Sequence, residues 1–502
     1  MHELKGKRVL ILQQRSWGMN IGHFLAKKLA AEGCALGAIT FKRTSHDFVL
    51  AQKDVEYEYI LNNDEVMSDP KKFLDGRDVD LKKVCDDLGI DSVWPIVMSL
   101  RQHVRSYREK WYYAYRQNVS DEEIIYFVKA VYIYINDMFE KFRPDVIIGP
   151  NFVALPQIML GLFAKSRGIR MLGVTDTKVK DYFMFSYSYR DDEGPLFKRI
   201  KELAEGAASP NREKAKTYIA EFRREFKKPS YAVDSGKKES LYRRLRHQLA
   251  PYRNIWVWYT KPRRNVLKST GITPDHRPPR IILRDFYAEK KYRKFAQRFD
   301  YYPLDKVGKC VFFPLQFQPE ASIDVIAPFF SNQLEMARLI AMALPADYTL
   351  IVKEHPAMVG MRTPSFYEKI SRTPNVKLID YRITSETAIK KADLLMSINS
   401  TTLSEAAYYH KPAIQFGSLG TTLLLPNVFR HTDMSTLSEK IKEILAVDLR
   451  TDEYERRLEN FVAAVYDTGF NVDYYQAWLE GQGSKEDMDL LWETYKKEIL
   501  AD

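Results

Sequence analysis

Short hydrophobic runs alternate with amphipathic stretches over the first 175 residues, a pattern typical of strands that alternate with helices. The apolar runs cover residues 8–12, 35–40, 145–149 and 170–175. Stretches with helical spacing cover residues 21–33, 121–142 and 154–166. Because connections between parallel strands need a crossover helix, this alternation predicts a parallel sheet covered by helices.

The same alternation returns, more regularly, from residue 310. Predicted strands cover residues 310–315, 348–353, 376–379, 394–398 and 413–416. Helical stretches follow at 331–343, near Phe366, at 385–392 and at 402–409. The predicted fold class is therefore α/β, with two doubly wound, Rossmann-like domains.

A chain of 502 residues is too long for one hydrophobic core, so several domains are expected. We predict an N-terminal Rossmann-like domain over 1–177 and a C-terminal one over 310–431. Residues 178–309 are interpreted as a basic, partly helical insertion or linker. Residues 432–502 are predicted to form helices that pack across the domains.

The positive charge is concentrated in one stretch. The chain carries a net charge of +11, yet residues 211–300 alone hold 25 Lys and Arg against 9 Asp and Glu. Four aromatic residues lie among these cations: Tyr252, Trp256, Trp258 and Tyr259. This composition suits the surface of an anionic membrane. A solvated helical face with buried aromatic side chains is an equally good interpretation.

The cysteine content and the apolar stretches of the chain indicate the cellular compartment. The three cysteines (Cys34, Cys85 and Cys310) are far apart, so neither a disulfide framework nor a zinc site is indicated. The N-terminus lacks the features of a signal peptide, and prolines interrupt the longest apolar stretch, 146–164. We expect a cytoplasmic protein, with peripheral attachment to the inner face of the membrane as a hypothesis. No GxGxxG follows the first strand, so a dinucleotide fingerprint is unsupported.

Polar residues follow the predicted strands of the C-terminal domain. Since ligands bind beyond the carboxyl ends of parallel strands, these residues are expected on one rim. Their types suit a nucleotide and its phosphates. The candidate binding residues are Gln316, Gln318, Glu320, Lys353, His355, Pro356, Asn399, Ser400, Thr401, Thr402 and Glu405.

Residues 399–402 are predicted to form the turn into a helix, whose free N–H groups and neighbouring hydroxyls attract phosphate. Glu405 would then accept hydrogen bonds from ribose. Thr402 and Glu405 also match a capping box, which needs no ligand. His355 is equally compatible with an ordinary packed or solvated histidine.

Three segments, "FFPLQFQPEAS", "VKEHP" and "SINSTTLSEAAYYHKPAIQFG", together resemble the donor-binding half of capsule and surface-polysaccharide glycosyltransferases of the GT-B fold. That group includes transferases that use CMP-activated acidic sugars such as Kdo and sialic acid. The resemblance covers about 311–421 and extends to the first 175 residues only in architecture. His410 stands where many of these enzymes have glycine.

The resemblance implies that His355 and Pro356 contact the nucleotide phosphate, that Ser400 and Thr401 bind phosphate, and that Glu405 contacts ribose. It further implies a nucleotide-sugar donor, a glycan or lipid-linked acceptor bound by the N-terminal domain, and neither a metal nor another cofactor.

The catalytic carboxylate should come from the rim of the N-terminal domain. Asp176, after the strand at 170–175, is the first candidate, and His23 is the second. A helix-capping loop is the alternative for Asp176.

Three other functions stay open at this point. A CDP-polyol phosphotransferase of the teichoic acid type would share the phosphate rim and differ in its donor. A nucleic-acid-binding protein would use the basic stretch, although no recognisable RNA or DNA module carries it, and no nucleic-acid partner is expected. A catalytically dead scaffold would retain the fold alone.

Overall fold

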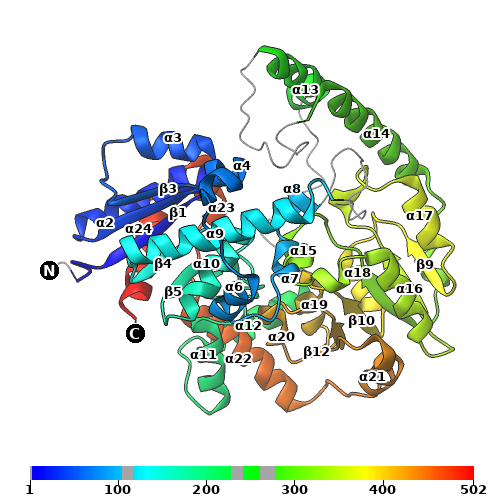
Figure 1. Ribbon diagram of the computed structural model, residues 1–502. Coiled ribbons are helices and arrows are strands. Elements are labelled where there is room, and N and C mark those ends of the chain that lie inside the picture. The colour runs from blue at the N-terminus through cyan, green and yellow to red at the C-terminus, as the bar shows by residue number, and fades with distance from the viewer. Residues whose placement is uncertain (1–2, 105–116, 228–240, 261–276, 502) are drawn as a thin grey trace.

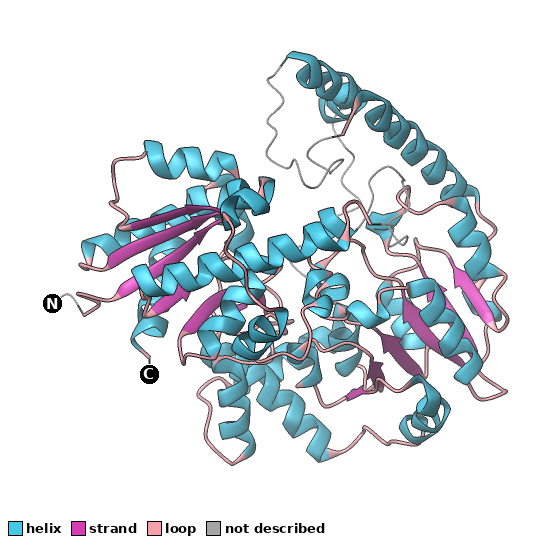
Figure 2. Cartoon of the chain, viewed as in Figure 1, coloured by secondary structure: helices cyan, strands magenta, loops and turns pink. Residues whose placement is uncertain are grey.

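The computed structural model describes residues 3–104, 117–227, 241–260 and 277–501 (Figure 1). The described chain contains two six-stranded sheets, ordered β3-β2-β1-β4-β5-β6 and β12-β11-β10-β7-β8-β9. Both orders correspond to 3-2-1-4-5-6, the order of a Rossmann sheet. Helices cover the faces of each sheet (Figure 2). The predicted α/β class with two doubly wound domains is confirmed.

The first sheet consists of β1 (Arg8–Gln13), β2 (Ala35–Thr40), β3 (Tyr59–Asn62), β4 (Val146–Ile148), β5 (Arg170–Asp176) and β6 (Phe183–Ser186). Only β6 runs antiparallel. The second sheet is parallel throughout and consists of β7 (Cys310–Pro314), β8 (Thr349–Lys353), β9 (Val376–Ile379), β10 (Leu394–Ser397), β11 (Ala413–Gln415) and β12 (Val428–Arg430). Because β6 belongs to the first sheet, that sheet extends past residue 177.

The helices around the first sheet are α1 (Arg15–Trp17), α2 (His23–Ala31), α3 (Arg43–Ala51), α4 (Asn63–Ser68), α5 (Pro70–Leu74), α6 (Leu81–Leu88), α7 (Trp94–Val97), α8 (Arg101–Val104), α9 (Asp121–Lys141) and α10 (Leu155–Lys165). A π-helical turn, Gly18–Gly22, joins α1 to α2. Those around the second sheet are α15 (Ala321–Asp324), α16 (Gln333–Ala343), α17 (Pro364–Ser371), α18 (Ser385–Lys391), α19 (Thr401–Ala407), α20 (Gly420–Leu423) and α21 (Leu437–Leu445).

The segment between the sheets contributes two pairs of helices. α11 (Pro195–Ala204) and α12 (Arg212–Arg224) pack against α22 (Asp452–Thr468). α13 (Leu241–Thr260) and α14 (Pro279–Arg298) pack on each other and stand at one side of the molecule (Figure 1). Residues 228–240 and 261–276 of the predicted basic stretch lie outside the described residues.

The C-terminal end of the chain returns to the first domain. Phe183 and Phe470 exchange two backbone hydrogen bonds of 2.9 Å. α23 (Tyr474–Glu480) and α24 (Lys485–Leu500) then bury Tyr474, Trp492 and Tyr495 in the core beside β1 and β5. The helices after residue 432 therefore touch both domains, since α21 packs on α16 of the second.

Candidate functional site

A cavity of about 760 Å³ lies between the two domains, beyond the carboxyl ends of β5, β7, β8 and β10. The strand order of the second sheet reverses between β7 and β10, and in open α/β sheets the crevice at such a reversal binds ligands. The cavity brings together eleven of the residues predicted from the sequence: Asp176, Gln316, Glu320, Lys353, His355, Pro356, Asn399, Ser400, Thr401, Thr402 and Glu405.

Two amides hold the crevice in shape. Gln316, after β7, donates through its side chain to the Asn399 carbonyl and accepts from the Asn399 N–H at 3.1 Å. The Asn399 side chain donates to the Ser322 carbonyl at 2.6 Å and accepts from the Leu419 N–H at 3.2 Å. Both side chains are buried and engaged with backbone groups, so they position the loops around the cavity.

A buried cation and a buried carboxylate line the C-terminal wall. Lys353 ends β8 and Glu405 lies in α19, and both are less than 8% exposed. Burial raises the pKa of Glu405 to about 7, with Lys353 opposing the rise. Burial lowers the pKa of Lys353, against the charges of Glu354 and Glu405. Among the residues that the structure describes, none forms a hydrogen bond with the Glu405 Oε2 atom, which leaves this atom available to a ligand hydroxyl.

His355 follows β8 and caps the short turn Pro356–Met358. Its Nδ1 accepts from the Ala357 N–H at 3.2 Å, so the neutral ring carries its proton on Nε2. Enclosure by the cavity walls and then the charge of Lys353 lower the pKa of this imidazole. A neutral ring with an exposed Nε2–H can donate to a phosphate oxygen.

Below His355 lies a buried ion pair. Glu354 and Arg362 have almost no exposed side-chain surface, and their Oε2 and Nε atoms lie 2.8 Å apart. Arg362 also donates to the Gln316 carbonyl at 2.9 Å. The pair therefore ties the loop after β8 to the loop after β7.

The helix after β10 begins differently from the predicted capping box. Ser400, not Thr402, is the N-cap of α19, and its Oγ accepts from the Thr402 N–H at 3.2 Å. The Ser400 and Thr402 hydroxyls also bond each other at 2.7 Å. The capping pattern is displaced by two residues because the chain already turns into the helix at Thr401.

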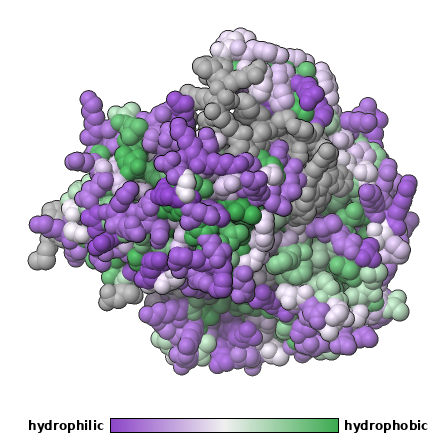
Figure 3. Space-filling model, viewed as in Figure 1, coloured by the Kyte–Doolittle hydropathy of each residue, from purple (hydrophilic) through white to green (hydrophobic). Residues whose placement is uncertain are grey.

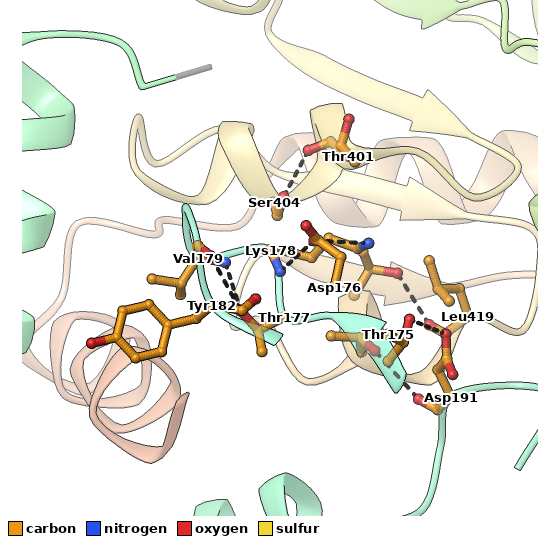
Figure 4. A network of polar contacts seen from close by, with 12 residues as sticks. Thr175, Asp176, Thr177, Lys178, Val179, Tyr182, Asp191, Thr401, Ser404 and Leu419 are labelled. Atoms are coloured by element: carbon orange, nitrogen blue, oxygen red, sulfur yellow. Dashed lines mark hydrogen bonds and ion pairs between the residues drawn. The ribbon is translucent and has the colours of Figure 1, made fainter. Parts of the chain in front are cut away.

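Asp176 faces these groups from the first domain. It ends β5, and its Oδ1 lies 3.2 Å from the Lys178 Nζ and accepts from the Lys178 N–H at 2.8 Å (Figure 4). Asp176, Thr401 and Glu405 also share the walls of a smaller adjoining pocket. Asp191 completes this side of the cavity: its carboxylate accepts from the Thr175 hydroxyl at 2.9 Å, and burial raises its pKa.

Two predicted site residues lie away from the cavity. His23 begins α2, where its Nε2 lies 3.1 Å from Asp54 and its ring packs edge-on against Phe48. His23 is therefore engaged with residues of its own domain and does not line the cavity. Gln318 is buried behind the cavity, where it donates to Asp324 at 3.0 Å and to the Ser331 carbonyl at 3.2 Å.

Sequence reasoning missed several residues of the cavity wall: Arg101, Lys178, Asp191, Glu354, Tyr475 and Trp478. Lys178 and Glu354 adjoin predicted residues, so the ends of β5 and β8 were a sufficient signal for them. Tyr475 and Trp478 lie about 300 residues from Asp176 along the chain, and only the packing of α23 brings them to the site.

Residues 276–419 match the family model of the capsule polysaccharide biosynthesis proteins. The match spans between a quarter and a third of the chain and includes every predicted binding residue of the second domain. It confirms the resemblance predicted from the three segments. The two Rossmann-like domains and the cavity between them are the GT-B arrangement that the resemblance implied.

The solved structures that match this chain share little sequence identity with it. The β-Kdo 2,7 transferase of KpsC from Thermosulfurimonas dismutans has 12% identity and a TM-score of 0.36, over 72% of this chain and 89% of that one. The β-Kdo 2,4 transferase of the same protein has 12% identity and a TM-score of 0.35, over 70% and 87%. The UDP-GlcNAc 2-epimerase from Methanocaldococcus jannaschii has 12% identity and a TM-score of 0.24, over 92% and 98%. TM-scores this low carry no information on function. No curated protein sequence is significantly similar to this chain.

The described residues contain neither a membrane-spanning helix nor a cluster of metal ligands. Within the ranges that the structure describes, no helix is both long and apolar enough to span a membrane. In the same ranges, no three His, Cys, Asp or Glu side chains are grouped as metal ligands would be.

The face of the molecule in Figure 3 is mainly hydrophilic, with hydrophobic side chains in small patches.

Proposed function

We propose that the protein is a glycosyltransferase that moves a sugar from a nucleotide-activated donor, such as a CMP-linked acidic sugar of the Kdo type, onto a cell-surface polysaccharide or lipid-linked acceptor. The observation that carries this proposal is the cavity at the strand-order reversal of the second sheet, with Asp176 facing it from the first domain. The family match of residues 276–419 supports the polysaccharide setting.

The second domain would hold the donor. Lys353, His355 and the hydroxyl of Thr401 line one wall and suit the phosphate, while the unpartnered Glu405 oxygen suits a ribose hydroxyl. As the sugar–phosphate bond breaks, negative charge grows on the leaving nucleotide. In this proposal Lys353 and the Nε2–H of His355 offset that charge, without a metal ion.

Asp176 would act as the base. The acceptor hydroxyl attacks the anomeric carbon of the donor, its proton passes to the Asp176 carboxylate, and the electron pair of the broken bond leaves with the nucleotide. The ammonium of Lys178, 3.2 Å from the Asp176 Oδ1, would hold that carboxylate in position beside the acceptor.

Replacing Asp176 tests this role. We expect Asp176→Asn to reduce sugar transfer at least about 100-fold, because the amide cannot accept the proton. Nucleotide binding, measured as the thermal shift produced by CMP, CDP, UDP or GDP, should stay at its wild-type value. Asp181→Asn, a neighbouring carboxylate outside the cavity, is the matched control and should transfer normally. Unchanged turnover in Asp176→Asn removes Asp176 from the mechanism.

The nucleotide panel also identifies the donor class. Stabilisation by CMP above the other three nucleotides is the expected result for a CMP-sugar donor. Stabilisation by CDP with polyol phosphate transfer would instead assign the chemistry to a polyol phosphotransferase. Absence of a shift with every nucleotide, beside retention of nucleic acid, would overturn the enzyme proposal.

We further propose that α13 attaches the protein to an anionic membrane. Six large side chains form one exposed stripe along this helix, each more than half exposed: Tyr242, Leu245, Leu249, Tyr252, Trp256 and Tyr259. The exposed cations Arg246 and Arg253 flank the stripe. Aromatic and aliphatic residues beside cations match the chemistry of an anionic lipid surface.

Flotation with liposomes tests this attachment. At low salt the protein should co-float with vesicles containing anionic lipid and stay behind with neutral vesicles. A Leu245→Glu and Trp256→Glu variant should lose co-flotation while keeping the nucleotide-induced thermal shift. Failure of the wild type to co-float at low salt would reject the proposed attachment.

A further inference from the structure

The last part of the chain contributes two aromatic side chains to the cavity. Tyr475 and Trp478 both line it, and they lie three positions apart on α23, so they share one face of that helix. The tyrosine is 37% exposed and the tryptophan is half-buried. Two aromatic side chains therefore border the cavity from the side of the first domain.

The scaffold fixes this helix firmly. Trp17 donates through its indole N–H to the Tyr474 hydroxyl at 2.8 Å, inside the core of the first domain. Asn20, in the π-helical turn between α1 and α2, donates to the Trp478 carbonyl at 2.8 Å. Gly481 ends α23 with a φ of 65° and packs against Asn20, where a Cβ atom would come within 2.9 Å of the amide oxygen. Held at both ends, α23 presents its aromatic side chains in a defined position.

The aromatic pair adjoins the candidate base. The Tyr475 ring packs edge-on against Phe183 of β6, the strand paired with β5, at a centroid distance of 5.5 Å. Burial raises the pKa of Tyr475, and the charge of Asp176 contributes next to that rise. Asp176 is thus close enough to Tyr475 for its negative charge to affect the phenol. A molecule that lies on the aromatic pair would therefore lie beside Asp176.

We propose that Tyr475 and Trp478 form a stacking platform for the acceptor sugar, which places a hydroxyl of that sugar beside Asp176. The ligand is a pyranose ring that offers a face of C–H groups, because such a face loses apolar surface to water when it covers an aromatic ring. Its polar edge would remain turned toward Asp176 and Lys178. This assignment rests on the proposed glycosyl transfer.

Saturation-transfer NMR with methyl pyranosides, including the methyl glycoside of Kdo, tests the platform in the full-length protein. In the wild type, saturation should reach the C–H protons of one ring face. Trp478→Ala should abolish this transfer, and Trp478→Phe, which keeps a ring, should retain part of it. Trp94→Ala, an exposed tryptophan of α7 outside the cavity, is the matched control and should behave as wild type.

Kinetics give a second readout. With an acceptor substrate identified, Tyr475→Ala and Trp478→Ala should each raise the KM for the acceptor about tenfold. A tenfold change corresponds to the loss of one aromatic contact of roughly 1.4 kcal/mol. The thermal shift produced by the nucleotide should not change, since the donor wall is untouched.

The outcomes separate the platform from the function on which it rests. Wild-type saturation transfer in both alanine variants, or none in the wild type while a nucleotide still stabilises it, overturns the platform alone. If no nucleotide stabilises the wild type, the proposed function fails first.

Discussion

At the scale of single residues, the electrostatics of the cavity centre on Glu405. Burial raises the pKa of its carboxyl from 4.5 to about 7, and one of its oxygens has no hydrogen-bond partner within the described part of the chain. Since the folded protein holds this proton more tightly than the unfolded chain, the contribution of Glu405 to stability is fully present below about pH 4.5. It is lost as the pH rises through 7.

Glu405→Gln mimics the protonated form and should remove this pH dependence. At pH 8 the variant should be more stable than the wild type by on the order of 3 kcal/mol, and at pH 5 by less than about 1 kcal/mol. Urea denaturation at the two pH values measures the difference. The exposed Glu439→Gln should show no such change. An equal gain at both pH values would place the titrating group elsewhere.

The sequence predicted which residues line the cavity where the end of a strand positions them. It did not do so where a loop or a helix distant in sequence positions them. Lys353 ends a strand, and His355 and Glu405 follow strands, whose apolar runs are visible in the sequence, and all three residues line the cavity. Gln318 follows β7 just as Gln316 does, yet the loop turns its amide inward to Asp324. Trp478 carries no local signal, because its place depends on tertiary packing alone.

At the scale of elements, the buried strands were predictable, including β9 at an edge of the second sheet, and the exposed edge strands were not. β1, β7, β8 and β10 are buried almost throughout, so they appear as continuous apolar runs. β3 and β12 lie at sheet edges without a single buried residue, and their sequences do not differ from loops. β6 follows so closely on β5 that it was assigned to the linker.

Arg362 links two loops that border the site, so its replacement should shift a whole loop and not a single side chain. Arg362→Met would leave Glu354 buried without its ion-pair partner, which costs about 3–5 kcal/mol. Denaturant unfolding should show that loss, and the nucleotide-induced thermal shift should shrink as the loop after β8 moves. Arg372→Met, an exposed arginine at the end of α17, is the control. The double variant Glu354→Gln and Arg362→Met should recover part of the stability; no recovery would show that the arginine acts through other contacts.

At the scale of the whole molecule, direct contacts between the domains frame the cavity. Arg101 of α8 lies 3.5 Å from the buried Asp324 of α15, and the Gly420 N–H donates to the Arg190 carbonyl at 2.9 Å. α22 runs along α11 and α12 and buries a further cluster with residues of the second domain. These contacts join residues that are far apart in the sequence, so no local sequence pattern indicates them. The sequence therefore predicted two domains but not how they are positioned relative to each other.

Gly420→Ala should separate domain alignment from nucleotide binding. A Cβ atom at this position would lie 2.4 Å from the Asp191 carbonyl oxygen and from the Asp192 Cα, so the loop of the first domain must move away. Because Asp176 and Asp191 share one wall, we expect transfer to fall about tenfold or more, as a misplacement near 1 Å suffices for a larger loss.

The nucleotide-induced thermal shift should stay close to that of the wild type, since the donor wall belongs to the second domain alone. Hydrogen exchange of the amides at 188–193 should rise. Gly308→Ala is the matched control, because a Cβ atom there meets nothing within 4 Å. Normal transfer by Gly420→Ala, despite faster exchange in that loop, would mean that catalysis does not depend on this contact between the domains.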